Sequence, residues 1–67
     1  MSKAEEAAIL TRLHWEDRRQ QILEWMQRVK KFSPDASEKA FSNFVETMVF
    51  VAGETGQMQY KMKRPWL

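Results

Sequence analysis

Residues 33–38 read SPDASE, and they carry the clearest structural signal in this chain of 67 residues. Proline cannot continue a preceding helix, but it is well placed in the first turn of a following one. Either Ser33 or Asp35 can cap the N-terminus of that following helix. The stretch therefore predicts two helices joined by only one or two residues, and so short a connection makes them antiparallel neighbours.

The segment before this junction predicts one long helix over residues 3–31. Ser2 and Glu5 have the spacing of a capping box, which places the first helical residue at Lys3. No glycine or proline follows until residue 34, and residues of high helix propensity dominate. Nothing local therefore stops the helix before the junction.

The segment after the junction predicts a second helix over residues 34–52. Its apolar residues recur at the three- and four-residue steps of one helical face. They are Ala40, Phe41, Phe44, Val45, Met48, Val51 and Ala52. Gly53 is the expected stop, because glycine is common just beyond the end of a helix.

The first helix is expected to outreach the second, and its apolar stripe changes sides in the overhanging part. Ile9, Leu10 and Leu13 point roughly away from the side that carries Trp15. Three arrangements explain the change: a break near Arg18, a straight helix packed between two partners, or a cover provided by the C-terminal tail. The straight helix is favoured, because the break has no proline or glycine to cause it.

Residues 57–67 form a tail that is both basic and aromatic. Polar and apolar residues alternate over 57–63, as in a half-buried extended strand. A strand hairpin with residues 48–52 stays open as an alternative, and it would shorten the second helix to about residue 47.

The expected fold is all-α. A single small domain spans residues 1–67, with an antiparallel helical hairpin over residues 1–56 followed by an extended tail. A chain of this size buries only about 60% of its unfolded surface, so we expect two copies to pack as a dimeric bundle. The absence of cysteine means that disulfides do not support the fold.

Catalytic chemistry is not expected. His14 is the single histidine, and the adjacent carboxylates Glu16 and Asp17 diverge by about 100° on a helix, so they do not form a catalytic pair. The ligands that a stable metal site needs are also missing. We therefore expect a protein that is not an enzyme and has no catalytic, cofactor-binding or metal-binding residues.

The sequence also bears on location. Its longest apolar run, residues 48–52, is far shorter than the roughly 20 residues of a membrane span, and the first residues lack the apolar core of a signal peptide. We expect a cytoplasmic protein that does not bind membranes.

Large apolar side chains outside the shared helix face point to protein binding. Tryptophan, methionine and arginine are enriched at protein interfaces. The favoured function is a non-enzymatic interaction module that regulates or inhibits a larger protein partner and forms a homodimer. The expected contact residues are Ile9, Leu10, Leu13, Trp15 and Arg18, with Tyr60, Met62 and Trp66 as a second strip.

Nucleic acid is the alternative partner. The chain has a net charge of +2, and aromatic rings next to cations can stack on bases while the cations neutralise phosphate. The candidate residues are Arg19, Lys30, Lys61, Lys63 and Arg64. The cations of the first helix scatter around its surface and form no phosphate-facing stripe, so protein binding is preferred.

Overall fold

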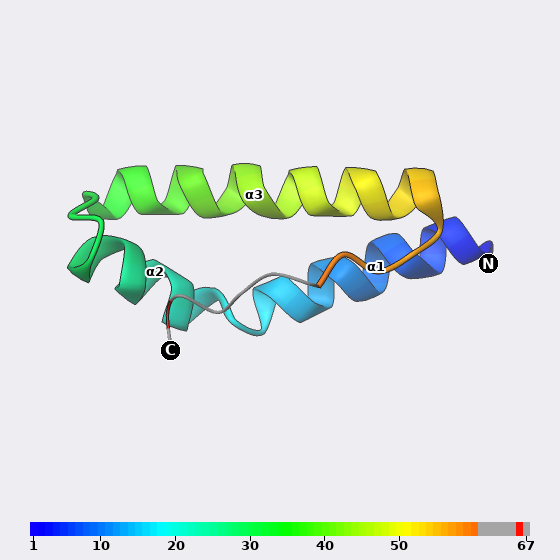
Figure 1. Ribbon diagram of the computed structural model, residues 1–67, viewed down its shortest axis with the longest axis horizontal. Helices are drawn as coiled ribbons and strands as arrows, with labels where there is room; N and C mark the ends of the chain where they lie inside the picture. Colours follow the sequence, from blue (N-terminus) through cyan, green and yellow to red (C-terminus); the bar gives the residue numbers. More distant parts are fainter. Residues whose placement is uncertain (61–65, 67) are drawn as a thin grey trace.

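The computed structural model describes residues 1–60 and residue 66, and this part of the chain is all-helical, as predicted (Figure 1). It contains α1 (Lys3–Glu16), α2 (Arg19–Arg28) and α3 (Pro34–Thr55). The helix α3 runs along both α1 and α2, which follow one another and form the opposite arm of a hairpin (Figure 1). Within the described residues there is no β-strand.

The starts of α1 and α3 lie where the sequence predicts them. The Ser2 hydroxyl accepts a hydrogen bond from the backbone N–H of Glu5 at 3.1 Å. The Ser33 hydroxyl accepts one from the backbone N–H of Ala36, also at 3.1 Å, and α3 begins at Pro34. Each hydroxyl satisfies one of the N–H groups that a helix N-terminus leaves without a partner.

The first arm breaks at residues 17–18, so the predicted continuous helix over residues 3–31 is wrong. The backbone N–H of Arg18 donates to the carbonyl of Trp15 at 3.1 Å, three residues back rather than four. The carbonyl of His14, four residues back, instead accepts a hydrogen bond from the guanidinium of Arg18 at 2.9 Å. A side chain that enters the backbone hydrogen-bond ladder is a recognised cause of a helix break. The break near Arg18, ranked lower from the sequence, is the arrangement observed.

The helix α2 ends at Arg28, and residues 29–33 connect it to α3, a longer connection than predicted. Lys31 has a φ of 60°, in the left-handed region that non-glycine residues rarely occupy. The backbone N–H of Phe32 then donates to the carbonyl of Met26 at 3.1 Å. This left-handed residue helps to reverse the chain direction between the two arms.

The helix α3 ends at Thr55, three residues beyond the predicted end. Gly53 lies inside the helix, and Gly56, with a φ of 70°, is the residue that terminates it. Its backbone N–H donates to the carbonyl of Ala52 at 2.8 Å. Since residues 48–52 are helical, the alternative of a strand hairpin with the tail is also wrong.

The predicted overhang of the first arm is absent as well. With 22 residues, α3 extends about 33 Å. Its end lies beside the start of α1, where the position of a Cβ on Gly56 would be 4.0 Å from the backbone nitrogen of Ala4. The two arms of the hairpin therefore have similar lengths.

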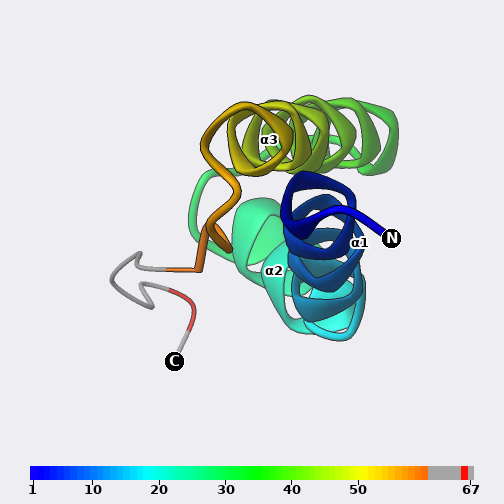
Figure 2. The same cartoon turned by 90° about the vertical axis from the view of Figure 1, so that its right-hand side faces the viewer.

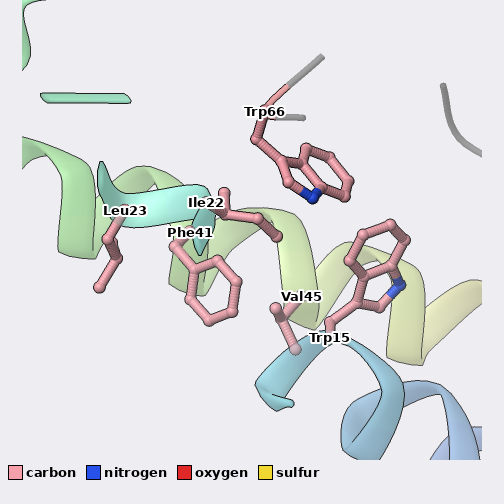
Figure 3. Close-up of a cluster of buried hydrophobic side chains, with 6 residues drawn as sticks. All are labelled: Trp15, Ile22, Leu23, Phe41, Val45 and Trp66. Carbon is pink, nitrogen blue, oxygen red and sulfur yellow. The ribbon is translucent and has the colours of Figure 1, made fainter. Parts of the chain in front are cut away.

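The hydrophobic core lies where α1, α2 and α3 meet (Figure 3). Its buried residues are Trp15, Ile22, Leu23, Phe41, Val45 and Trp66. Partly buried residues pack around them, namely Trp25, Met26, Phe44, Met48 and Val49. Phe41, Val45 and Ala52 are buried along one face of α3, which confirms the predicted apolar stripe of the second helix.

Candidate protein-interaction surface

The helix α1 presents two different faces. Ala7, Thr11 and Trp15, spaced four residues apart, are buried. Because successive residues of a helix are rotated by 100°, Leu10 and Leu13 lie on the other side, together with Ile9. The exposed fractions are 46% for Ile9, 39% for Leu10 and 60% for Leu13. The two large side chains of Leu10 and Leu13 thus remain in solvent while small Ala7 and Thr11 face the hairpin.

Carboxylates bracket these three apolar residues along the helix. Glu6 lies one turn before them, and Glu16 and Asp17 lie one turn after them. Residues three and four apart are neighbours on a helix surface, so all six residues form one stripe. We call this stripe the α1 outer face; it comprises Glu6, Ile9, Leu10, Leu13, Glu16 and Asp17.

Arg12, beside this stripe, is held by a carboxylate of α3. Its guanidinium donates two hydrogen bonds to Glu46, at 2.7 and 3.1 Å. The side-chain hydrogen bonds raise the pKa of Arg12 and, together with the charge of the guanidinium, lower the pKa of the Glu46 carboxyl. The positive charge of Arg12 is thus compensated within the hairpin.

Arg18 lies at the other end of the stripe, next to Asp17. One of its guanidinium nitrogens is 3.7 Å from the Asp17 carboxylate, and the same nitrogen donates to the carbonyl of His14. The Asp17 side chain nevertheless keeps 81% of its surface in solvent. Residues 1–17 carry two cationic side chains and four carboxylates, so the region around the α1 outer face is acidic.

A second feature of α1 is the attachment of the tail. The buried hydroxyl of Thr11 accepts a hydrogen bond from the backbone N–H of Gln59 at 3.0 Å. The indole nitrogen of Trp15 donates to the carbonyl of the same residue at 2.7 Å. These two bonds hold the start of the tail on one flank of the hairpin (Figure 2).

Trp15 is the centre of an aromatic cluster in the core. Its ring meets the ring of Phe44 edge-on at 4.8 Å and that of Trp66 at 6.0 Å. The exposed fractions are 1% for Trp15 and 7% for Trp66, and Figure 3 shows the two indole rings next to each other. Both tryptophans were predicted to be open to a partner, and that prediction is wrong because the chain uses them to close its own core.

The other residues predicted for protein contact are spread over the molecule. Arg18 is half-buried and bonded to its own backbone neighbours. Tyr60 is exposed, and its ring centre lies 6.0 Å from that of His14. Met62 lies outside the described residues. Of the predicted contact residues, Ile9, Leu10 and Leu13 are the ones that the structure gathers into one exposed patch.

The residues predicted for nucleic-acid binding are not gathered into one site among the described residues. Arg19 forms an ion pair with Glu38 and lies over the ring of Phe41. The ammonium of Lys30 lies 5.4 Å from the ring centre of Trp25. Lys61, Lys63 and Arg64 fall outside the described residues. The two cations that can be placed therefore both engage side chains of this chain.

No group of three or more histidine, cysteine, aspartate or glutamate side chains is placed so that it could hold a metal ion within residues 1–60 and 66. Over the same residues, none of the helices has the length and apolar character needed to cross a membrane.

The sequence reasoning missed two parts of this surface. It weighed Glu16 and Asp17 only as a catalytic pair and gave Glu6 no role, although the one-turn spacing of all three from the apolar residues was visible. It also missed Thr11, which holds the tail only because Gln59 lies beside α1 in the folded chain. The spacing of Ala7, Thr11 and Trp15 was the available signal for the buried face of α1.

No protein-family model matches this sequence, and no curated protein or solved structure shows a detectable similarity to it.

Proposed function

We propose that this chain is a non-enzymatic interaction module that binds a larger protein through the α1 outer face. The observation that supports the proposal is the exposure of Ile9, Leu10 and Leu13 on adjacent turns, opposite the face that packs on α3. Apolar residues scattered singly on a surface need no explanation, whereas a contiguous patch with a polar rim is typical of an interaction site.

The size of the patch favours a reversible interaction. Complete burial of a leucine or isoleucine contributes about 1.5–3 kcal/mol, and these side chains already bury about half of their surface. The remaining gain is roughly 1 kcal/mol for each side chain. A protein that binds in this way is suited to regulate or inhibit a partner by covering part of its surface and then dissociating.

Site-specific photocrosslinking tests this proposal. A benzophenone amino acid is placed at Leu13, in the full chain expressed in its native cells, and at Asn43, an exposed position on α3, as the matched control. We expect a discrete adduct, larger than twice the mass of the chain, from position 13 alone. The adduct should disappear when Ile9 and Leu10 are replaced by glutamine. No adduct at position 13, or equal adducts at both positions, would refute the proposal.

A further inference from the structure

We propose that the α1 outer face selects a basic amphipathic helix of its protein partner. This inference rests on the proposed function and names the chemistry of the partner segment. The stripe is apolar in its middle and negative at both ends, through Glu6 on one side and through Glu16 and Asp17 on the other. A complementary segment has apolar residues in its middle and cations at both ends.

The dimensions of the stripe favour a helix as the occupant. Glu6 and Glu16 are ten residues apart, which is about 15 Å along a helix axis. The apolar centre is one side chain wide, as in complexes where a helix uses residues at positions i, i+3, i+4 and i+7. The matching segment carries two or three apolar residues at this spacing, with lysine or arginine one turn to either side.

Three cations lie near this stripe and offset only part of its negative charge, and one of them, Lys3, lies one turn before Glu6. Arg12 is bound to Glu46 by two hydrogen bonds, and its charge is balanced there. Arg18 lies 3.7 Å from Asp17 and offsets part of the charge at that end, while Asp17 remains well exposed. Exposed carboxylates at both ends of an apolar patch attract a basic partner and disfavour an acidic one.

A second copy of the chain fits this face poorly. A twofold interface brings the same surface of each copy together. In an antiparallel pairing of two α1 helices, Glu6 of one copy approaches Glu16 and Asp17 of the other. In a parallel pairing, each carboxylate approaches its own counterpart. Both pairings place like charges opposite each other, which costs binding free energy, so the homodimer expected from the sequence is disfavoured at this face.

Two synthetic helical peptides provide the test. They share the same leucines at positions i and i+4, and they differ in carrying either lysines or glutamates one turn before and after these leucines. Each is titrated into the 15N-labelled full chain at low salt. We expect the lysine peptide to shift the amide signals of residues 6–17 and to bind at least tenfold more tightly than the glutamate peptide. Because the charges are exposed, the preference should shrink in 0.5 M NaCl.

Charge reversal provides the matched variants. The double substitution Glu6→Lys and Glu16→Lys should reverse the preference, so that the glutamate peptide binds more tightly. The control Glu24→Lys and Glu54→Lys changes the net charge by the same amount at exposed positions outside the α1 outer face, and it should keep the preference for the lysine peptide.

The outcomes separate this inference from the proposed function. Equal binding of the two peptides, or binding of neither, overturns the inference of a basic helix, while the crosslink at Leu13 still decides the proposed function. Amide shifts of residues 6–17 that depend on the concentration of the chain itself would show a second copy on this face and would overturn the inference. Shifts confined to other residues would overturn it too.

Discussion

The buried hydroxyl of Thr11 accepts a hydrogen bond from the backbone N–H of Gln59, a residue 48 positions further along the chain. The side chain of Thr11 and the backbone of Gln59 are thus paired, although they are too far apart in the sequence for any local pattern to link them. The carbonyl of Gln59 is bound in turn by the indole of Trp15. The backbone N–H and the backbone carbonyl of Gln59 are therefore both hydrogen-bonded to side chains of α1.

This relationship predicts a cost for Thr11→Val, which keeps the shape of the side chain and removes the hydroxyl. The N–H of Gln59 loses its acceptor, and an unsatisfied partly buried donor costs about 1–2 kcal/mol. We expect the free energy of unfolding, measured by urea titration, to fall by about this amount. Thr47→Val removes an exposed hydroxyl on α3 and should change it by less than about 0.5 kcal/mol. Equal effects of the two variants would contradict the role of Thr11.

The two glycines should respond to alanine in opposite directions. Gly53 lies inside α3, where an added Cβ would have no neighbour within 4 Å, so Gly53→Ala should stabilise the protein by about 0.5–1 kcal/mol. Gly56 has a φ of 70°, so Gly56→Ala should destabilise it by about 1–2 kcal/mol. Thermal and urea unfolding measure both effects. If α3 ended at residue 52, as the sequence predicts, Gly53→Ala would destabilise the protein instead.

The break between α1 and α2 should depend on the guanidinium of Arg18. In Arg18→Met, the carbonyl of His14 loses this donor and becomes available to the backbone N–H of residue 18. We expect the 13Cα shift of residue 18, whose backbone is not helical in the folded chain, to move toward the helical value. The control Arg19→Met removes the ion pair with Glu38 and should leave this shift unchanged. An unchanged shift in Arg18→Met would show that other contacts hold the break.

The pair of Arg12 and Glu46 should make a small, pH-dependent contribution to stability. Its hydrogen bonds and charge lower the pKa of the Glu46 carboxyl in the folded chain, so the unfolded chain binds a proton more readily. The contribution is present above the ordinary carboxyl pKa and is lost as the pH falls through the lowered value. In Arg12→Met, a 13C titration of the Glu46 carboxyl should show its pKa return toward the ordinary value. Arg19→Met is the control and should leave the pKa of Glu46 in place.

The α1 outer face should tolerate polar substitution. Leu13 is 60% exposed, so Leu13→Gln should change the free energy of unfolding by less than about 0.5 kcal/mol. Ile22→Ala, in the core, should lower it by about 2–5 kcal/mol. Circular dichroism during urea unfolding compares the two. A large loss of stability in Leu13→Gln would mean that this face supports the fold, and binding experiments with its variants would then need other substitutions.

Local signals predicted much of the fold. Ser2 marked the start of α1, and Ser33, one of the two candidate caps, marked the start of α3, because an N-cap needs only a side-chain acceptor beside the first helical turn. The four-residue spacing of Phe41 and Val45 identified the buried face of α3. These features depend on residues close in sequence, so the sequence contains the information for them.

The features that were missed depend on contacts that sequence periodicity does not encode. At the break the side chain of Arg18 donates to the backbone carbonyl of His14, and arginine carries no general sequence signal for a break. Gly53 and Gly56 are both plausible helix ends, and α3 ends at Gly56.

The candidate site was predicted in part. The helical repeat alone predicts that Ile9, Leu10 and Leu13 lie on a different face of the helix from Trp15. The burial of Trp15 and Trp66 requires the far end of the chain to return to α1, an arrangement that the sequence left open but did not favour. The sequence alone does not distinguish an aromatic residue that binds a partner from one that packs in the core.

The contact of Trp15 with Trp66 also sets an order of events during synthesis. The ribosome makes Trp66 fifty-one residues after Trp15. Before that residue is made, the aromatic cluster around Trp15 lacks one of its rings. The indole of Trp15 lacks this cover on that side until residue 66 has been made.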